Sequence, residues 1–107
     1  MKTVALSDRP ITTMGGLRVL PDLTLDKLKP TSSGMLVLPG GDAWDKKKNK
    51  ATALMAAEFL AKEIPVAAIC GATVGLARIG LLDDIPYTQQ LEGIHRSHRL
   101  ESCCLAR

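Results

Sequence analysis

Aromatic residues are scarce in this chain of 107 residues, which contains one Trp, one Tyr and one Phe. Proteins that bind single-stranded nucleic acid combine a basic groove with several aromatic side chains on which bases stack. The formal net charge here is only +3, and the one dense basic run, Lys46-Lys47-Lys48, is short. We therefore expect no nucleic-acid partner.

Long apolar runs are also absent. A membrane-spanning helix needs about twenty consecutive apolar residues, and the sequence has no such stretch. Residues 1–7 have the pattern of a short strand and lack the cleavage pattern of a secretory signal peptide. These absences predict a single cytoplasmic domain that does not act at a membrane.

Cysteine is limited to three residues. An odd count without an export signal argues against a disulfide framework. Cys103-Cys104 and the nearby His95 and His98 add up to four potential metal ligands, but adjacent cysteines do not match the paired spacing of zinc sites. We predict free thiols, surface histidines, and neither a metal nor a cofactor.

The elements that are present are those of an α/β protein. Apolar patterns and turn residues predict strands over 2–7, 11–13, 17–20, 35–38 and 65–69, a helical turn over 23–28, and helices over 50–62 and from residue 71 through Leu81. The strands on either side of Gly15-Gly16 should form a β-hairpin. The helix over 50–62 predicts a crossover between two parallel strands.

Cys70 occupies the junction between the strand over 65–69 and the helix that follows it. The unpaired N–H groups of a first helical turn favour an anion beside them, which is how a thiolate is stabilised. Gly71 removes a side chain that would crowd a sharp strand-to-helix turn. The pattern predicts a nucleophile elbow with Cys70 at its tip.

Gly40 and Gly41 close the preceding strand, so they should lie at the same carboxyl edge of the sheet as Cys70. Glycines there allow backbone N–H groups to approach a substrate oxygen, as in an oxyanion hole. A plain Pro-Gly-Gly turn is the alternative. Trp44, just past the glycines, would either wall a substrate pocket or pack against a helix, and we favour packing.

Three segments, 14–22, 36–44 and 68–73, together resemble the class I glutamine amidotransferase-like superfamily, in its PfpI branch of intracellular proteases and deglycases. The resemblance implies a flavodoxin-like (Rossmann-like) α/β fold, a parallel sheet sandwiched by helices with a small β-hairpin. It covers residues 1–90 as a partial domain, followed by an irregular or disordered segment over 91–107. It also implies that Cys70 is the nucleophile and that the backbone at Gly40, Gly41 and Gly71 binds the oxyanion. Tyr87 is a further candidate pocket residue.

The chain departs from this family at both ends. Members begin with a strand and a helix that have no counterpart here, so the central strand of the sheet is expected to be missing. Where members carry a histidine after the elbow helix, this sequence reads Tyr87-Thr88-Gln89-Gln90. A gene truncation with a frameshift is the explanation we expect. Apolar sheet edges would then be exposed and favour self-association or a homodimer.

The sequence leaves three functions open. The first is a cysteine-dependent hydrolase, amidotransferase-like or deglycase-type enzyme acting on a small molecule or a peptide. The second is a non-catalytic redox or stress protein in which Cys70 is oxidised. The third is an inactive truncated remnant.

Overall fold

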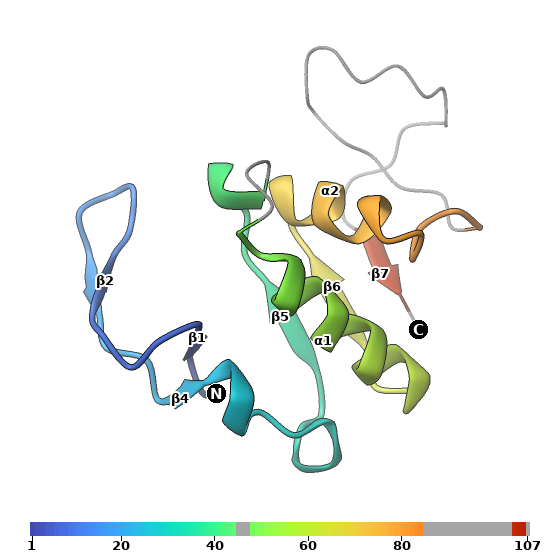
Figure 1. Ribbon diagram of the computed structural model, residues 1–107, viewed down its shortest axis with the longest axis horizontal. Coiled ribbons are helices and arrows are strands. Elements are labelled where there is room, and N and C mark those ends of the chain that lie inside the picture. Colours follow the sequence, from blue (N-terminus) through green and yellow to red (C-terminus); the bar gives the residue numbers. More distant parts are fainter. Residues whose placement is uncertain (45–47, 85–103, 107) are drawn as a thin grey trace.

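The computed structural model describes residues 1–44, 48–84 and 104–106 (Figure 1). Its strands are β1 (Val4–Ala5), β2 (Ile11–Thr12), β3 (Arg18–Val19), β4 (Leu23–Thr24), β5 (Leu36–Leu38), β6 (Val66–Ala68) and β7 (Cys104–Ala106). Helix α1 (Lys50–Ala61) lies between β5 and β6 in the chain, and α2 (Gly71–Arg78) follows β6. Short 3-10 turns form at Leu25–Lys27, Pro30–Ser32 and Asp42–Trp44. No helix among these residues is long and apolar enough to cross a membrane.

The centre of the fold is the predicted crossover unit. Strands β5 and β6 are parallel, with Leu36 opposite Val66 and Leu38 opposite Ala68, and α1 connects them. This register places the residues after Leu38 and those after Ala68 at one edge of the sheet. Gly40 and Gly41 therefore lie next to Cys70 at this edge, as the sequence predicted.

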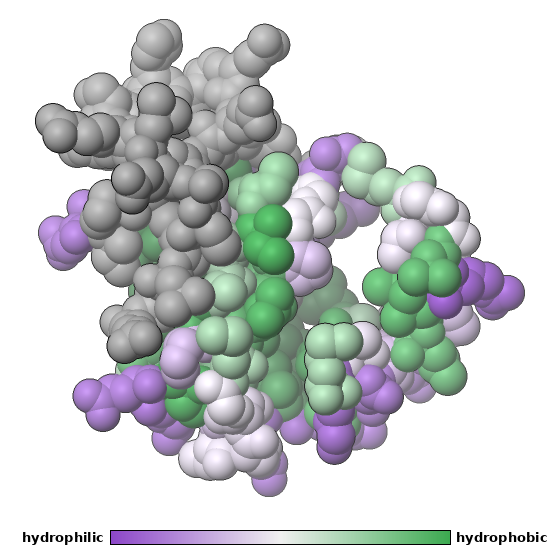
Figure 2. All heavy atoms as spheres, turned by 180° about the vertical axis from the view of Figure 1, so that it is seen from behind, coloured by the Kyte–Doolittle hydropathy of each residue, from purple (hydrophilic) through white to green (hydrophobic). Residues whose placement is uncertain are grey.

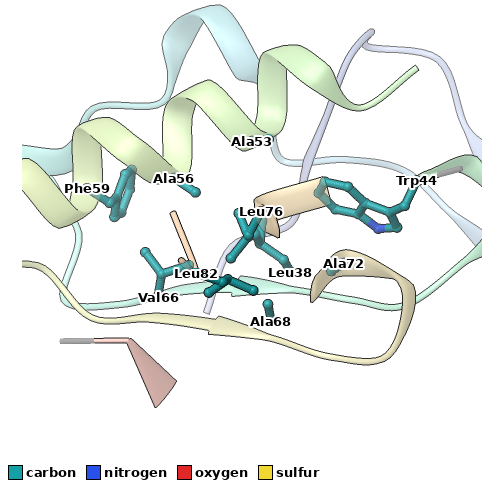
Figure 3. Packing of buried hydrophobic residues seen from close by; sticks show 10 residues of the cluster. All are labelled: Leu38, Trp44, Ala53, Ala56, Phe59, Val66, Ala68, Ala72, Leu76 and Leu82. Carbon is teal, nitrogen blue, oxygen red and sulfur yellow. The ribbon is translucent and has the colours of Figure 1, made fainter. Parts of the chain in front are cut away.

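Both helices pack on the same face of β5 and β6. The core contains ten apolar residues from the two helices, the two strands and the segments beside them, namely Leu38, Trp44, Ala53, Ala56, Phe59, Val66, Ala68, Ala72, Leu76 and Leu82 (Figure 3). Phe59 has no exposed surface, and complete burial of such a side chain contributes about 1.5–3 kcal/mol. Val37 points away from this core and is 53% exposed.

Helix α1 covers nearly the predicted range of 50–62 and ends at Ala61. The chain leaves the helix through Glu63, whose φ of 57° lies in the left-handed region. The N–H of Ile64 donates to the carbonyl of Phe59 at 2.9 Å and completes this turn. Alanines at 53 and 56 let the helix approach the sheet and α2 closely.

The N-terminal part contains the predicted hairpin, in which β2 and β3 are antiparallel. The helical turn predicted over 23–28 is wrong in its first half, because Leu23–Thr24 forms β4 and pairs in parallel with β1. Hydrogen bonds between Thr3 and Asp22 align the two segments and favour the extended conformation. Only Leu25–Lys27 is helical.

The hairpin projects away from the helices and carries apolar side chains on its surface (Figures 1 and 2). Met14 is 87% exposed, and Leu17 and Leu20 are 66% and 69% exposed. Surface of this kind is consistent with the predicted self-association, which stays a prediction.

Strand β7 differs from the irregular segment predicted over 91–107. Cys104–Ala106 pairs antiparallel with β6, so one sheet edge that we expected to be open is occupied. The outer edge of β5 has no strand beside it within the described parts of the chain. Strand β5 has only three residues. A short strand suits an open edge, because it leaves few unpaired N–H and C=O groups to pair with another chain.

Candidate active site

Cys70 lies between the end of β6 and the first residue of α2, as the sequence predicted. Its φ of 50° and ψ of −121° are rare for any residue other than glycine. Such backbone strain costs of order 1–3 kcal/mol and persists only where the surroundings impose it. Cys70 is exposed and carries a free thiol, so the turn presents the sulfur to solvent at the sheet edge.

Thr73 holds this turn in place. Its Oγ1 donates to the carbonyl oxygen of Cys70 at 2.6 Å, and its backbone N–H donates to the same oxygen at 3.1 Å. Thr73 is 2% exposed, the only polar residue buried to this degree in the described chain. Sequence reasoning missed it, although a threonine hydroxyl near the start of a helix commonly donates to a carbonyl three or four residues earlier.

Two glycines are required by close packing around Cys70. A Cβ atom on Gly40 would lie 2.9 Å from the Cβ of Cys70, and one on Gly71 would lie 2.7 Å from the carbonyl oxygen of Gly41. Real Cβ atoms essentially never approach other atoms so closely. The side chain missing from Gly41, by contrast, would meet open space. Steric exclusion therefore explains Gly40 and Gly71, but not Gly41.

Backbone donors lie beside the thiol. The N of Gly41 is 3.5 Å from the Cβ position of Gly71, which puts the two peptide units next to each other. Within residues 1–44 and 48–84 neither the N–H of Gly41 nor that of Gly71 donates to an acceptor. Two adjacent unpaired N–H groups can hold a developing negative charge on oxygen.

Trp44 packs in the core instead of lining an open pocket. It is 6% exposed, and its Nε1 donates to the carbonyl oxygen of Pro39 at 2.9 Å. Figure 3 shows its ring beside α2. The packing interpretation that the sequence favoured is the one that the structure has, and Trp44 offers no side-chain surface to a substrate.

The described residues contain no group of three or more His, Cys, Asp or Glu side chains that could hold a metal ion. Tyr87, His95, His98 and Cys103 lie outside them. The candidate site within the described residues consists of the Cys70 thiol, the strained turn and the backbone N–H groups of Gly41 and Gly71.

A family model described as the DJ-1/PfpI family matches residues 1–92. The chain belongs to the DJ-1/PfpI family. The similarity proposed from the three sequence segments is thereby confirmed. Among curated members, the uncharacterized proteases YoaZ and YdeA of Bacillus subtilis (strain 168) are each 37% identical to it over 86 residues. Those residues are 80% of this chain and 41% and 42% of the two relatives.

Solved structures of DJ-1/PfpI proteins have the same fold. The thiJ/pfpI family protein from Bacillus anthracis superposes with a TM-score of 0.72 at 40% identity, over 82% of this chain and 42% of its own. A DJ-1 superfamily protein from Agrobacterium tumefaciens gives 0.74 at 34% identity, over 83% and 47%. The α/β fold class is thereby confirmed, and the chain spans about two fifths of the length of the curated relatives it matches.

Proposed function

We propose that this chain carries the nucleophile and oxyanion-binding part of a cysteine-dependent hydrolase that cleaves amide bonds, with Cys70 as the nucleophile. The observation that carries the proposal is the positive φ of Cys70 at the junction of β6 and α2, beside the N–H groups of Gly41 and Gly71, which have no acceptor within residues 1–44 and 48–84. The two curated relatives are named proteases, which supports a peptide as the substrate class.

The proposed reaction follows from this geometry. The Cys70 thiolate attacks the carbonyl carbon, a C–S bond forms, and the π pair of the carbonyl moves to its oxygen. The N–H groups of Gly41 and Gly71 donate to this oxyanion. When the tetrahedral intermediate collapses, the C–N bond breaks and the amine leaves with a proton from water. Water then cleaves the thioester, releases the acid and restores the thiol.

Glycine packing supports the oxyanion assignment. Because Gly71 lacks a side chain, the backbone of Gly41 can approach the first turn of α2 closely, and because Gly40 lacks one, the loop can lie against Cys70. A substrate carbonyl placed over Cys70 then meets backbone donors, with no Cβ atom from either glycine in the way. Removal of one oxyanion donor in a hydrolase costs about 10²–10³-fold in turnover, so this arrangement would supply a large share of catalysis.

The test combines labelling with turnover. Iodoacetamide labelling at pH 7, resolved by peptide mass spectrometry, gives the reactivity of Cys70 relative to Cys103 and Cys104 in the same chain. A fluorogenic peptide-amide library then measures hydrolysis by the wild type and by Cys70→Ala. We expect Cys70 to react fastest and Cys70→Ala to abolish hydrolysis.

Three results would overturn the proposal. Hydrolysis that survives in Cys70→Ala would assign the reaction elsewhere. Equal labelling of all three cysteines without hydrolysis would indicate an inactive remnant. Selective conversion of Cys70 to the sulfenic acid by hydrogen peroxide, again without hydrolysis of any peptide, would favour the redox function.

A further inference from the structure

We infer that Trp44 and Arg78 are positioning residues for the proposed reaction, fixing the glycine loop over 39–44 against the helix that carries Cys70. Both act through the loop, since the indole of Trp44 donates to Pro39 and the guanidinium of Arg78 donates to the carbonyl oxygen of Trp44. The inference rests on the proposed function, since it assigns how the oxyanion donors are held in register with the nucleophile.

The loop is held at both ends by one residue. The indole Nε1 of Trp44 donates to the carbonyl oxygen of Pro39 at 2.9 Å, which ties the end of the loop back to its start. The carbonyl oxygen of Trp44 in turn accepts a hydrogen bond from Nη1 of Arg78 at 2.8 Å. The bond from Trp44 to Pro39 closes residues 39–44 into a ring that contains Gly40 and Gly41. The bond from Arg78 attaches this ring to α2.

The surface of α2 is shaped to receive the indole. A Cβ atom on Gly75 would lie 2.2 Å from Cε3 of Trp44 and 2.7 Å from Cζ3. Glycine in the interior of a helix weakens that helix, and Gly75 is nevertheless buried at the middle of α2. Close approach of the indole ring accounts for a glycine here, because any side chain would push the ring and its loop away.

One helix therefore carries both parts of the site. Cys70 precedes the first residue of α2, and Arg78 is the last residue of the same helix. The Trp44 contact with Arg78 joins the far end of α2 to the loop, and the contact of Gly41 with Gly71 joins its near end. The loop cannot slide along the helix without breaking one of these contacts, and misplacement by about 1 Å costs a reaction about 10²-fold.

Arg78→Gln tests the inference, because glutamine keeps a donor of shorter reach but loses the charged guanidinium. Hydrolysis of the peptide amide needs the oxyanion donors, whereas iodoacetamide labelling of Cys70 is a displacement that does not. We expect kcat to fall about 10–100-fold, with the labelling rate within about twofold of wild type. Arg78→Lys should recover part of kcat, and Lys62→Gln, which removes a cation beside the end of α1, should leave kcat unchanged.

Trp44 supplies a second readout, since it is the only tryptophan of the chain. Acrylamide quenching of its emission should increase in Arg78→Gln and not in Lys62→Gln. If the wild type hydrolyses nothing, the proposed function fails, and this quenching alone decides whether Arg78 holds the loop.

Two outcomes would overturn the inference. The first is an Arg78→Gln protein with the hydrolysis and quenching of the wild type. The second is a parallel decrease in hydrolysis and labelling, which would indicate a general loss of structure around the elbow.

Discussion

Gly71 faces the carbonyl oxygen of Gly41, and a Cβ atom at position 71 would lie 2.7 Å from that oxygen. The contact joins the loop after β5 to the first turn of α2, directly beside Cys70. Because the atom that would be struck belongs to the backbone, it cannot turn aside as the end of a flexible side chain can. The loop itself would have to move.

Gly71→Ala should therefore impair the site more than the fold. Crowding of this kind costs about 1–3 kcal/mol, and the displaced Gly41 would no longer align its N–H with the substrate oxygen. We expect a lower urea midpoint at an unchanged m-value, and a loss of peptide hydrolysis. Gly34→Ala is the control, since a Cβ atom there has nothing within 4 Å. Equal stability and hydrolysis in the two variants would refute the steric argument.

Thr73→Val should loosen the strained turn. Valine keeps the shape of threonine but removes the hydroxyl that donates to the carbonyl oxygen of Cys70 at 2.6 Å. Loss of one such hydrogen bond costs about 0.5–1.5 kcal/mol, and the remaining N–H of residue 73 still donates to the same oxygen. Denaturant unfolding gives the change in free energy.

Thr73→Ser keeps the hydroxyl and serves as the matched control for the valine variant. It should retain the hydrogen bond to Cys70 and lose only the contacts of one methyl group. If serine destabilises the protein as much as valine, methyl packing and not the hydrogen bond holds the elbow.

Local patterns predicted the centre of this fold well. The apolar run before Cys70, the glycine after it and the alanine-rich segment over 50–62 each contain their own signal within a few residues. Parallel pairing of β5 with β6 follows from the crossover alone, and it brings Gly40 to Cys70. The elbow could therefore be located from sequence without any knowledge of distant contacts.

Contacts between distant residues could not be predicted in the same way. Arg78 and Trp44 are 34 positions apart, and neither residue has a local pattern that points to the other. Gly75 resembles any glycine in a weak helix until the indole ring lies against it. Similarly, Leu23–Thr24 has the composition of a helical turn, and only the bonds from Thr3 to Asp22 select a strand.

The two helices end differently, and this difference predicts a stabilising change. Each is followed by a residue in the left-handed region, Gly80 with φ of 78° after α2 and Glu63 with φ of 57° after α1. A left-handed conformation costs a residue with a side chain about 1–2 kcal/mol, and glycine almost nothing. Glu63→Gly should therefore raise the free energy of unfolding by about 1 kcal/mol, as measured by urea denaturation.

The reciprocal control is Gly80→Ala, which should lower stability by a similar amount. Glu58→Gly, inside α1, should also destabilise, by about 1 kcal/mol, because glycine there weakens the helix. A destabilising Glu63→Gly would mean that the Glu63 side chain contributes more than its backbone conformation costs.

Asp22 should make the stability of the N-terminal strands depend on pH. The backbone N–H of Thr3 donates to its Oδ2 at 2.7 Å and the Thr3 hydroxyl donates at 2.8 Å. These hydrogen bonds, with a smaller effect of the charge on Lys2, hold the pKa of Asp22 below its ordinary value of 3.8. Because the folded pKa is the lower one, the stabilisation is complete above the unfolded pKa and is lost as the pH falls through the folded pKa.

The difference in stability between wild type and Asp22→Asn should accordingly be largest near neutral pH and shrink as the pH falls from about 5 to about 2. Thr3→Ala should give an intermediate profile, because it removes the hydroxyl but keeps the backbone donor. Urea unfolding at a series of pH values measures all three proteins. Parallel profiles for wild type and Asp22→Asn over this range would contradict the prediction. They would show that the Thr3 hydrogen bonds stabilise the ionised carboxylate and the neutral acid equally. Alignment of β1 with β4 would then depend on backbone pairing alone.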